Sequence, residues 1–189
     1  MIRGRGVLAH PDPASDEHLF EEGNSRMTHV TASAVPPQSP NIVILVTGDR
    51  HARYTEWADC VALQIRNQTM GQSYELVHGA QKRWNPALNE YTGIDYIAAD
   101  VARWTIASWG VTCQITPVPA DWSRFGKGAG PRRNAEMRDY LLDRQRDGAR
   151  VVCLAFHPNL EASKGTGNMV KLARSAGIPV ETFDGRAVR

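Results

Sequence analysis

Apolar residues follow two alternating patterns from residue 41 onward. Short runs rich in aliphatic and β-branched residues are typical of buried strands, whereas longer stretches with apolar residues three and four positions apart indicate helices with one buried face. The predicted strands span 41–47, 74–78, 111–118, 151–156 and 179–183. Helical spacing fills the gaps between them, joining Trp57 to Ile65, Ile94 to Thr105, Met137 to Leu141 and Met169 to Ala176.

Five strands alternating with four helices predict an α/β domain: a Rossmann-like parallel sheet with helices on both faces. Nearly continuous apolar runs such as "VILV" within 41–47 agree with burial on both sides of the sheet. In such folds ligands bind outside the carboxyl ends of the strands, near the reversal of strand order. We therefore expect the binding residues in the loops that follow the strands.

Residues 1–40 break this pattern, since they hold five of the eleven prolines and few large apolar residues. Such a segment cannot bury enough apolar surface to offset its ordering entropy. We expect 1–40 to be a flexible N-terminal extension and 41–189 to form a single domain.

The net charge of +2 favours neither nucleic acid nor membrane binding by the whole chain. No apolar run approaches the roughly 18 residues that span a bilayer, and the N-terminus lacks a signal-peptide core, so we expect a cytoplasmic protein. Cys60, Cys113 and Cys153 lie far apart in apolar segments and are expected to be reduced core thiols. The histidines form no metal-ligating pair, and neither metal nor cofactor is expected.

The stretch "FGKGAGPRRNAEM" (125–137) places three glycines before a helical run. Pro131 suits a first helical position, which makes Gly130 the predicted cap. A helix start with free amides and a positive dipole end attracts phosphate. We therefore predict an anion site here, with Gly130 in contact with the ligand.

Arg133 begins the stripe that continues through Met137 and Leu141 toward the core. A cation on this side needs an anionic partner, and both a ligand and an internal carboxylate remain open. Asn134, beside it, is a further ligand-binding candidate. This stretch holds two other cations, Lys127 and Arg132. For each of them, contact with the ligand and a solvated position on the surface are equally open.

The stretch "KGTGNM" (164–169) also places glycines at a predicted helix start that follows a strand. Gly165, Thr166 and Gly167 would hold a second part of the same anion through their amides and the threonine hydroxyl. The alternative is an ordinary N-cap threonine. No G-x-x-x-x-G-K-[ST] string occurs, so ATP hydrolysis of the P-loop type is not expected.

The other strand-end loops supply further candidates. Asp95 lies in "TGID" (92–95), where it either marks a helix start in a near-capping box or binds a ribose hydroxyl. The remaining ligand-binding candidates in these loops are Gly48, Asp49, Arg50, Gly79 and Gly93.

In order and spacing, "VTGDR", "HGA…TGID", "PADWSRFGKGAGPRRNAEM", "VVCLAF" and "KGTGNMVKLARSAGIPV" resemble the SLOG superfamily, in particular its YspA-like branch of bacteria and phages. The resemblance covers about residues 41–184. It implies a Rossmann-like domain that binds a nucleotide or nucleotide derivative. The superfamily includes LOG phosphoribohydrolases, which cut the N-glycosidic bond of nucleoside monophosphates, single-strand DNA-processing proteins, and nucleotide-signal sensors. LOG-like proteins pair through helices, so it also implies a homo-oligomer.

Arg133 and Met137 match the LOG arginine that stands four residues before a methionine, but Met169 occupies the position of the LOG glutamate. If the chain is an enzyme of this kind, Arg133 is one catalytic candidate, and either Asp49 or Asp95 must supply the carboxylate in place of the missing glutamate. Residues 81–92 depart from the HGGARGAD pattern of the branch and form either a lid or a surface elaboration.

Together these features predict binding of a phosphate-bearing nucleotide or nucleotide-derived molecule, with N-glycosidic cleavage as the reaction to test. One alternative is single-stranded nucleic-acid binding by residues 117–150, where eight basic side chains face five acidic ones. Another is a non-catalytic scaffold or nucleotide-signal sensor.

Overall fold

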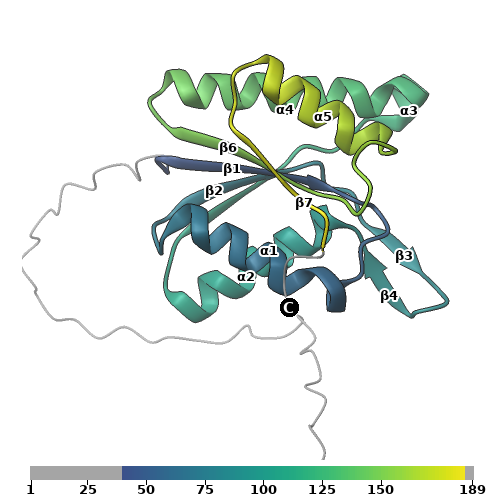
Figure 1. Ribbon diagram of the computed structural model, residues 1–189, viewed down its shortest axis with the longest axis horizontal. Coiled ribbons are helices and arrows are strands. Elements are labelled where there is room, and N and C mark those ends of the chain that lie inside the picture. The colour runs from purple at the N-terminus through teal and green to yellow at the C-terminus, as the bar shows by residue number, and fades with distance from the viewer. Residues whose placement is uncertain (1–39, 186–189) are drawn as a thin grey trace, which may run out of the picture. The chain divides into compact units, whose positions relative to one another are not determined.

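The computed structural model describes residues 40–185, and residues 1–39 of the expected extension lie outside them. The fold is a five-stranded parallel sheet with strand order β5-β2-β1-β6-β7 (Figure 1). The strands are β1 (Ile42–Gly48), β2 (Tyr74–His78), β5 (Cys113–Pro117), β6 (Arg150–Phe156) and β7 (Val180–Phe183). The connecting helices are α1 (Tyr54–Thr69), α2 (Ile94–Trp109), α4 (Ala129–Arg146) and α5 (Lys164–Ser175). The predicted Rossmann-like α/β class is confirmed.

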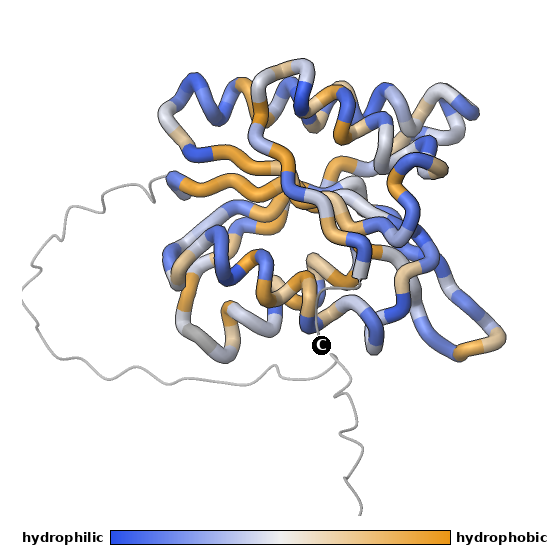
Figure 2. The backbone as a smooth tube through the Cα atoms, viewed as in Figure 1, coloured by the Kyte–Doolittle hydropathy of each residue, from blue (hydrophilic) through white to orange (hydrophobic). Residues whose placement is uncertain are grey.

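Helices cover both faces of the sheet: α1 and α2 lie on one side, and α4 and α5 on the other (Figure 1). Alternate residues of β1 serve the two cores, since Ile44 packs with α1 and α2 whereas Leu45 packs with α4 and α5. Full burial of such a side chain contributes about 1.5–3 kcal/mol. Figure 2 shows the resulting apolar strands between helices that carry hydrophilic residues.

The strand order reverses at the centre of the sheet. From β1 the chain moves through β2 to the edge strand β5, then returns to β6 on the other side of β1. Gly48 and Phe156 are paired at the carboxyl ends of β1 and β6. The loops after these two strands diverge, which places a crevice at this point.

Two local predictions are wrong. The 81–92 segment forms a hairpin, β3 (Arg83–Asn85) and β4 (Glu90–Thr92), which interrupts the strict strand–helix alternation. Helix α4 begins at Ala129, so its N-cap is Gly128 and not Gly130. A short helix, α3 (Trp122–Phe125), and one 3-10 turn precede it. Pro131 still fits, because amides in a first helical turn have no intrahelical acceptor.

Within residues 40–185, every helix lacks either the length or the apolarity needed to cross a bilayer. The three cysteines are free thiols; Cys60 and Cys153 are buried, and Cys113 is half-buried.

Candidate functional site

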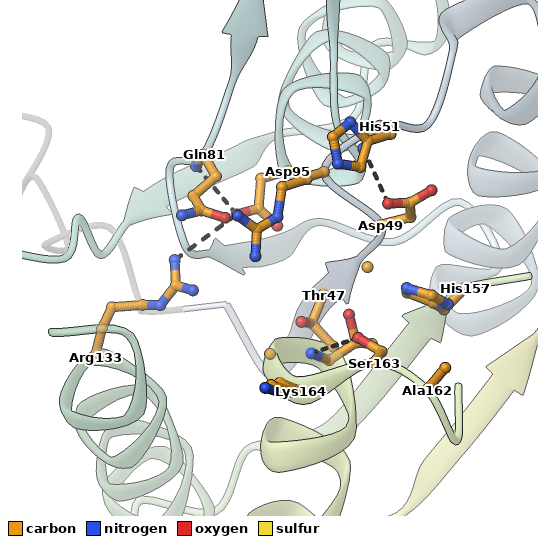
Figure 3. Close-up of a pocket in the computed structure, with 14 residues that line it drawn as sticks. Thr47, Asp49, His51, Gln81, Asp95, Arg133, His157, Ala162, Ser163 and Lys164 are labelled. Atoms are coloured by element: carbon orange, nitrogen blue, oxygen red, sulfur yellow. Dashed lines mark hydrogen bonds and ion pairs between the residues drawn. The ribbon is translucent and has the colours of Figure 1, made fainter. Parts of the chain in front are cut away.

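A cavity of about 300 Å³ opens where the carboxyl ends of β1 and β6 meet the start of α5 (Figure 3). It receives residues from the loop after β1, the start of α2, the first turns of α4 and the β6–α5 connection. Its lining consists of Thr47, Gly48, Asp49, Arg50, His51, Gln81, Asp95, Arg133, His157, Ala162, Ser163, Lys164, Gly165 and Thr166. This is the crevice that the reversal of strand order predicts.

Arg133 extends from α4 into the wall of this cavity, toward Asp95 and Gln81 (Figure 3). Its Nη1 donates to the Gly79 carbonyl at 2.6 Å and lies 3.9 Å from Asp95 Oδ2. Its residue exposure is 9%. Of the two partners considered for Arg133, the structure contains the internal carboxylate, and the guanidinium also lines the cavity.

Asp95 is a buried carboxylate at the start of α2. Burial raises its pKa to about 6, although Arg133 and the amides of Gln81 and Gly79 act in the opposite direction. The near-capping box expected at "TGID" does not form. The N-cap of α2 is Gly93, without a side-chain cap, and the Thr92 hydroxyl is instead within hydrogen-bonding distance of the Arg50 and Arg83 carbonyls.

Two of the predicted glycines allow close packing around the cavity. A Cβ at Gly79 would lie 1.8 Å from Arg133 Nη1, in the space of the guanidinium. A Cβ at Gly48 would lie 2.4 Å from the Phe156 carbonyl oxygen and would also clash with Ile94. Larger residues at either position would displace the groups that form the cavity wall.

The start of α5 presents unpaired amides to the cavity. Ser163 is the N-cap, and its Oγ accepts from the Thr166 amide at 3.2 Å. Thr166 therefore lies inside the helix, and the N-cap threonine alternative is wrong. The amides of Lys164 and Gly165 have no intrahelical partner, and no group within residues 40–185 accepts a hydrogen bond from them.

Asn134 lies behind the cavity lining, with 2% exposure. Its Oδ1 accepts from Arg133 Nε at 3.1 Å, and its Nδ2 lies 3.2 Å from the Gly165 carbonyl and 2.9 Å from Asn168 Oδ1. It therefore connects α4 to the first turn of α5. Arg133 and the α5 amides are thus held in fixed relative positions.

Several predicted residues do not line the cavity. Trp122 of α3 packs over Gly130, and the Arg132 guanidinium lies 4.5 Å from the ring centroid of Phe125. Lys127 is exposed in the 3-10 turn. Gly130, Lys127 and Arg132 are therefore absent from the cavity lining. Three other predicted glycines also lie outside the lining: Gly79, Gly93, whose amide donates to the Ala52 carbonyl, and Gly167.

Other cavity residues were absent from the predicted site: Thr47, His51, Gln81, His157, Ala162, Ser163 and Lys164. Two of them have defined partners. His157 Nδ1 accepts from the Asn159 amide at 3.1 Å, and His51 Nδ1 lies 3.4 Å from Arg83 Nη1. Most of them lie in loops after strands, so the strand-end rule would have found them if applied to whole loops.

The charges of the cavity favour an anion with hydroxyl groups. Asp95 offsets Arg133, which leaves the exposed cations Arg50 and Lys164 against Asp49. Carboxylate oxygens such as those of Asp49 accept hydrogen bonds from hydroxyls. Within residues 40–185, no three His, Cys, Asp or Glu side chains lie close enough together to hold a metal ion.

Comparison with known proteins places the chain in no family. No protein-family model matches the sequence, and no curated protein matches it. Two structures of the C-terminal domain of a hydrogenase from Pyrococcus furiosus are similar, with TM-scores of 0.40 and 0.37 at 10% and 12% identity. The matches cover 79% and 78% of this chain and 97% and 95% of those chains. Similarity at this level carries no information about ligands or activity.

Proposed function

We propose that the cavity binds a phosphate-bearing nucleotide or a nucleotide-derived molecule. The observation that carries the proposal is the first turn of α5, where two unpaired amides and the Lys164 side chain adjoin one cavity. Helix N-termini attract phosphate through their free amides and positive dipole end. Arg50, an exposed cation, adds positive charge around the same space.

The carboxylates support a sugar-bearing ligand over inorganic phosphate. Asp49 and Asp95 line the cavity together with Arg50 and Lys164. Acidic side chains at strand ends bind ribose hydroxyls in dinucleotide-binding Rossmann folds. The resemblance to the SLOG superfamily supports the same class of ligand.

Binding of nucleoside monophosphates to the protein tests this function by calorimetry. Lys164→Ala is the primary variant, because Lys164 is exposed and its loss spares the internal contacts of Arg133. We expect affinity to fall about tenfold or more, as for loss of a hydrogen bond to a charged group. Arg146→Ala, at the far end of α4, is the control and should bind as the unmodified protein does. If neither nucleoside monophosphates nor dinucleotides bind, the proposal fails.

N-glycosidic cleavage is a second candidate activity, and the two carboxylates favour it. Burial raises the pKa of Asp95 to about 6, whereas Asp49 is half-buried and accepts a hydrogen bond from the His51 amide at 3.0 Å. Carboxyl groups in unlike environments are the usual acid and base of glycoside chemistry. Met169, at the LOG glutamate position, is fully buried and contributes nothing to the cavity lining.

Release of free base from nucleoside monophosphates tests this activity. Asp49→Asn and Asp95→Asn should each slow the release at least 100-fold if both carboxylates take part. Release that is unchanged in both variants, or no faster than in a protein-free blank, would exclude it.

Single-stranded nucleic-acid binding by residues 117–150 has weaker support. Four of the eight basic side chains form ion pairs within the protein: Arg133, Arg138, Arg144 and Arg146. Paired cations release few counterions on binding, so an oligonucleotide should show a shallow dependence of affinity on salt. A steep dependence would favour this alternative.

A further inference from the structure

A second groove runs along α5 beside the cavity. It measures about 730 Å³ and shares Ala162, Ser163 and Lys164 with the cavity lining. The start of α5 therefore borders both the cavity and the groove.

Three cations follow this groove along one face of α5. Lys164, Lys171 and Arg174 are separated by seven and three residues, which places Lys171 about 10 Å and Arg174 about 15 Å from Lys164 along the helix axis. All three are exposed, and within residues 40–185 none forms an ion pair with a carboxylate. One acidic residue, Glu161, lines the same groove.

The groove also has apolar walls, which a merely solvated helix face does not need. Leu160, which is half-buried, lines it beside Gly167, whereas Val170 is only 3% exposed and adds little surface. A Cβ at Gly167 would lie 3.4 Å from the Leu160 carbonyl oxygen, at the close end of ordinary van der Waals contact. The loop before α5 therefore packs closely against the helix at this position.

The cavity and the groove differ in a complementary way. The cavity is small and lined mainly by polar and charged side chains, with no aromatic side chain apart from two histidines. Ligand sites of 300–1,000 Å³ are usually lined by apolar groups with a few placed polar ones. The cavity thus suits phosphate and sugar, whereas the groove offers apolar contact for a base and two further cations for a second phosphate.

We propose that the ligand is a dinucleotide, with one phosphate and sugar in the cavity and a second, phosphate-linked nucleotide in the groove along α5. This inference rests on the proposed function, because the first nucleotide occupies the cavity. Lys171 and Arg174 contact the second phosphate, and Leu160 contacts the second base.

Calorimetry with 5′-phosphorylated ribodinucleotides of the four bases, against the matching monophosphates, tests the inference. We expect at least one dinucleotide to bind tenfold or more tightly than its monophosphate. Lys171→Ala and Arg174→Ala together should remove this advantage and leave monophosphate affinity within about twofold. Arg146→Ala, at an exposed cation of α4 outside both the cavity and the groove, should change neither affinity.

The outcomes separate the two proposals. If monophosphates bind and the dinucleotides bind no more tightly, or if the advantage survives both substitutions, the dinucleotide inference is wrong and the proposed function stands. If affinity keeps rising from two to six nucleotides, the groove belongs to an extended-strand site, which also overturns the inference. If neither class of ligand binds, both proposals fail.

Discussion

Asp95 and Arg133 carry opposite charges within a wall of the cavity that is largely closed to water. The Asp95 carboxylate has the Gln81 amide and Arg133 as its neighbours, and the guanidinium also donates to Gly79 and Asn134. Removing one partner from a buried pair costs more than the pair contributes, because the other charge is left unpaired in a medium that solvates it poorly.

Arg133→Ala should therefore lower the free energy of unfolding by about 3 kcal/mol, measured by urea denaturation. The double variant Arg133→Ala, Asp95→Asn should recover part of this loss, since the unpaired carboxylate is gone. A single substitution that costs less than about 0.5 kcal/mol would contradict the buried pair.

Gly79→Ala tests the packing around the same guanidinium. The new methyl group would occupy the position of Arg133 Nη1, so we expect a loss of about 1–3 kcal/mol in the free energy of unfolding. Gly128→Ala is the control, because no atom lies within 4 Å of a Cβ there and its φ of −80° suits alanine. Equal effects of the two substitutions would be evidence against the packed wall.

Asp95 and His78 give opposite pH dependences. Folding raises the pKa of Asp95 from 3.8 to about 6, so the folded state binds more protons and this group makes stability fall as pH rises across that window. Burial, aided by Arg103 and Arg133, lowers the pKa of His78 from 6.5 to about 4, so its contribution makes stability rise with pH between those values.

Between pH 4 and 6, Asp95→Asn should therefore show a steeper rise of stability with pH than the unmodified protein, and His78→Gln a shallower one. Each difference amounts to at most about 3 kcal/mol across the window. Urea denaturation at several pH values measures both slopes. Parallel curves for all three proteins would refute the two pKa shifts.

At this scale the sequence predicted burial of Arg133 from its spacing with Met137 and Leu141, and all three side chains are buried. Its partner remained open, because the pairing depends on how α2 and α4 are placed across the sheet. Lys127 and Arg132 are close to Arg133 in sequence, but neither lines the cavity, and Arg132 lies over the ring of Phe125.

At the scale of elements, the β3–β4 hairpin is fixed to the loop after β1. Besides the contacts of Thr92 with Arg50 and Arg83, Arg53 Nε donates to Glu90 at 2.9 Å. The hairpin thus supports the backbone beside two cavity residues, Arg50 and His51.

Thr92→Val removes the hydroxyl while keeping the side-chain shape, and it leaves the carbonyl groups that it serves without this donor. We expect a loss of about 1–3 kcal/mol in stability and faster hydrogen exchange of the hairpin amides. Thr112→Val, at an exposed threonine, should leave exchange in the hairpin unchanged. Unaltered hairpin exchange in Thr92→Val would show that this hydroxyl does not hold the hairpin.

The predicted strands and main helices are confirmed because each has a strong apolar period, as in β1 and α2. The hairpin lacks such an apolar period. Its large apolar residues Trp84, Leu88 and Tyr91 are exposed, so burial in a core does not determine its sequence pattern. The start of α4 was misplaced because Pro131 is compatible with any position in the first helical turn.

At the scale of the molecule, the cavity forms where the strand order of the sheet reverses. The loops after β1 and β6 meet the starts of α2, α4 and α5 at one edge of the sheet. The location of the site was therefore predictable from the fold class alone. Its detailed lining was not, because residues from the β1 loop, the starts of α2 and α4 and the β6–α5 connection meet there only in the folded chain.

The most direct test of the central claim is a titration of the ¹⁵N-labelled protein with nucleoside monophosphates, followed by NMR. The account predicts that the amide signals of Gly48, Lys164 and Gly165 shift with a common saturation curve. Those at the far end of α4, around Arg146, should stay fixed. Shifts confined to residues 117–130, or no shifts with any of the nucleotides, would contradict a nucleotide site at this cavity.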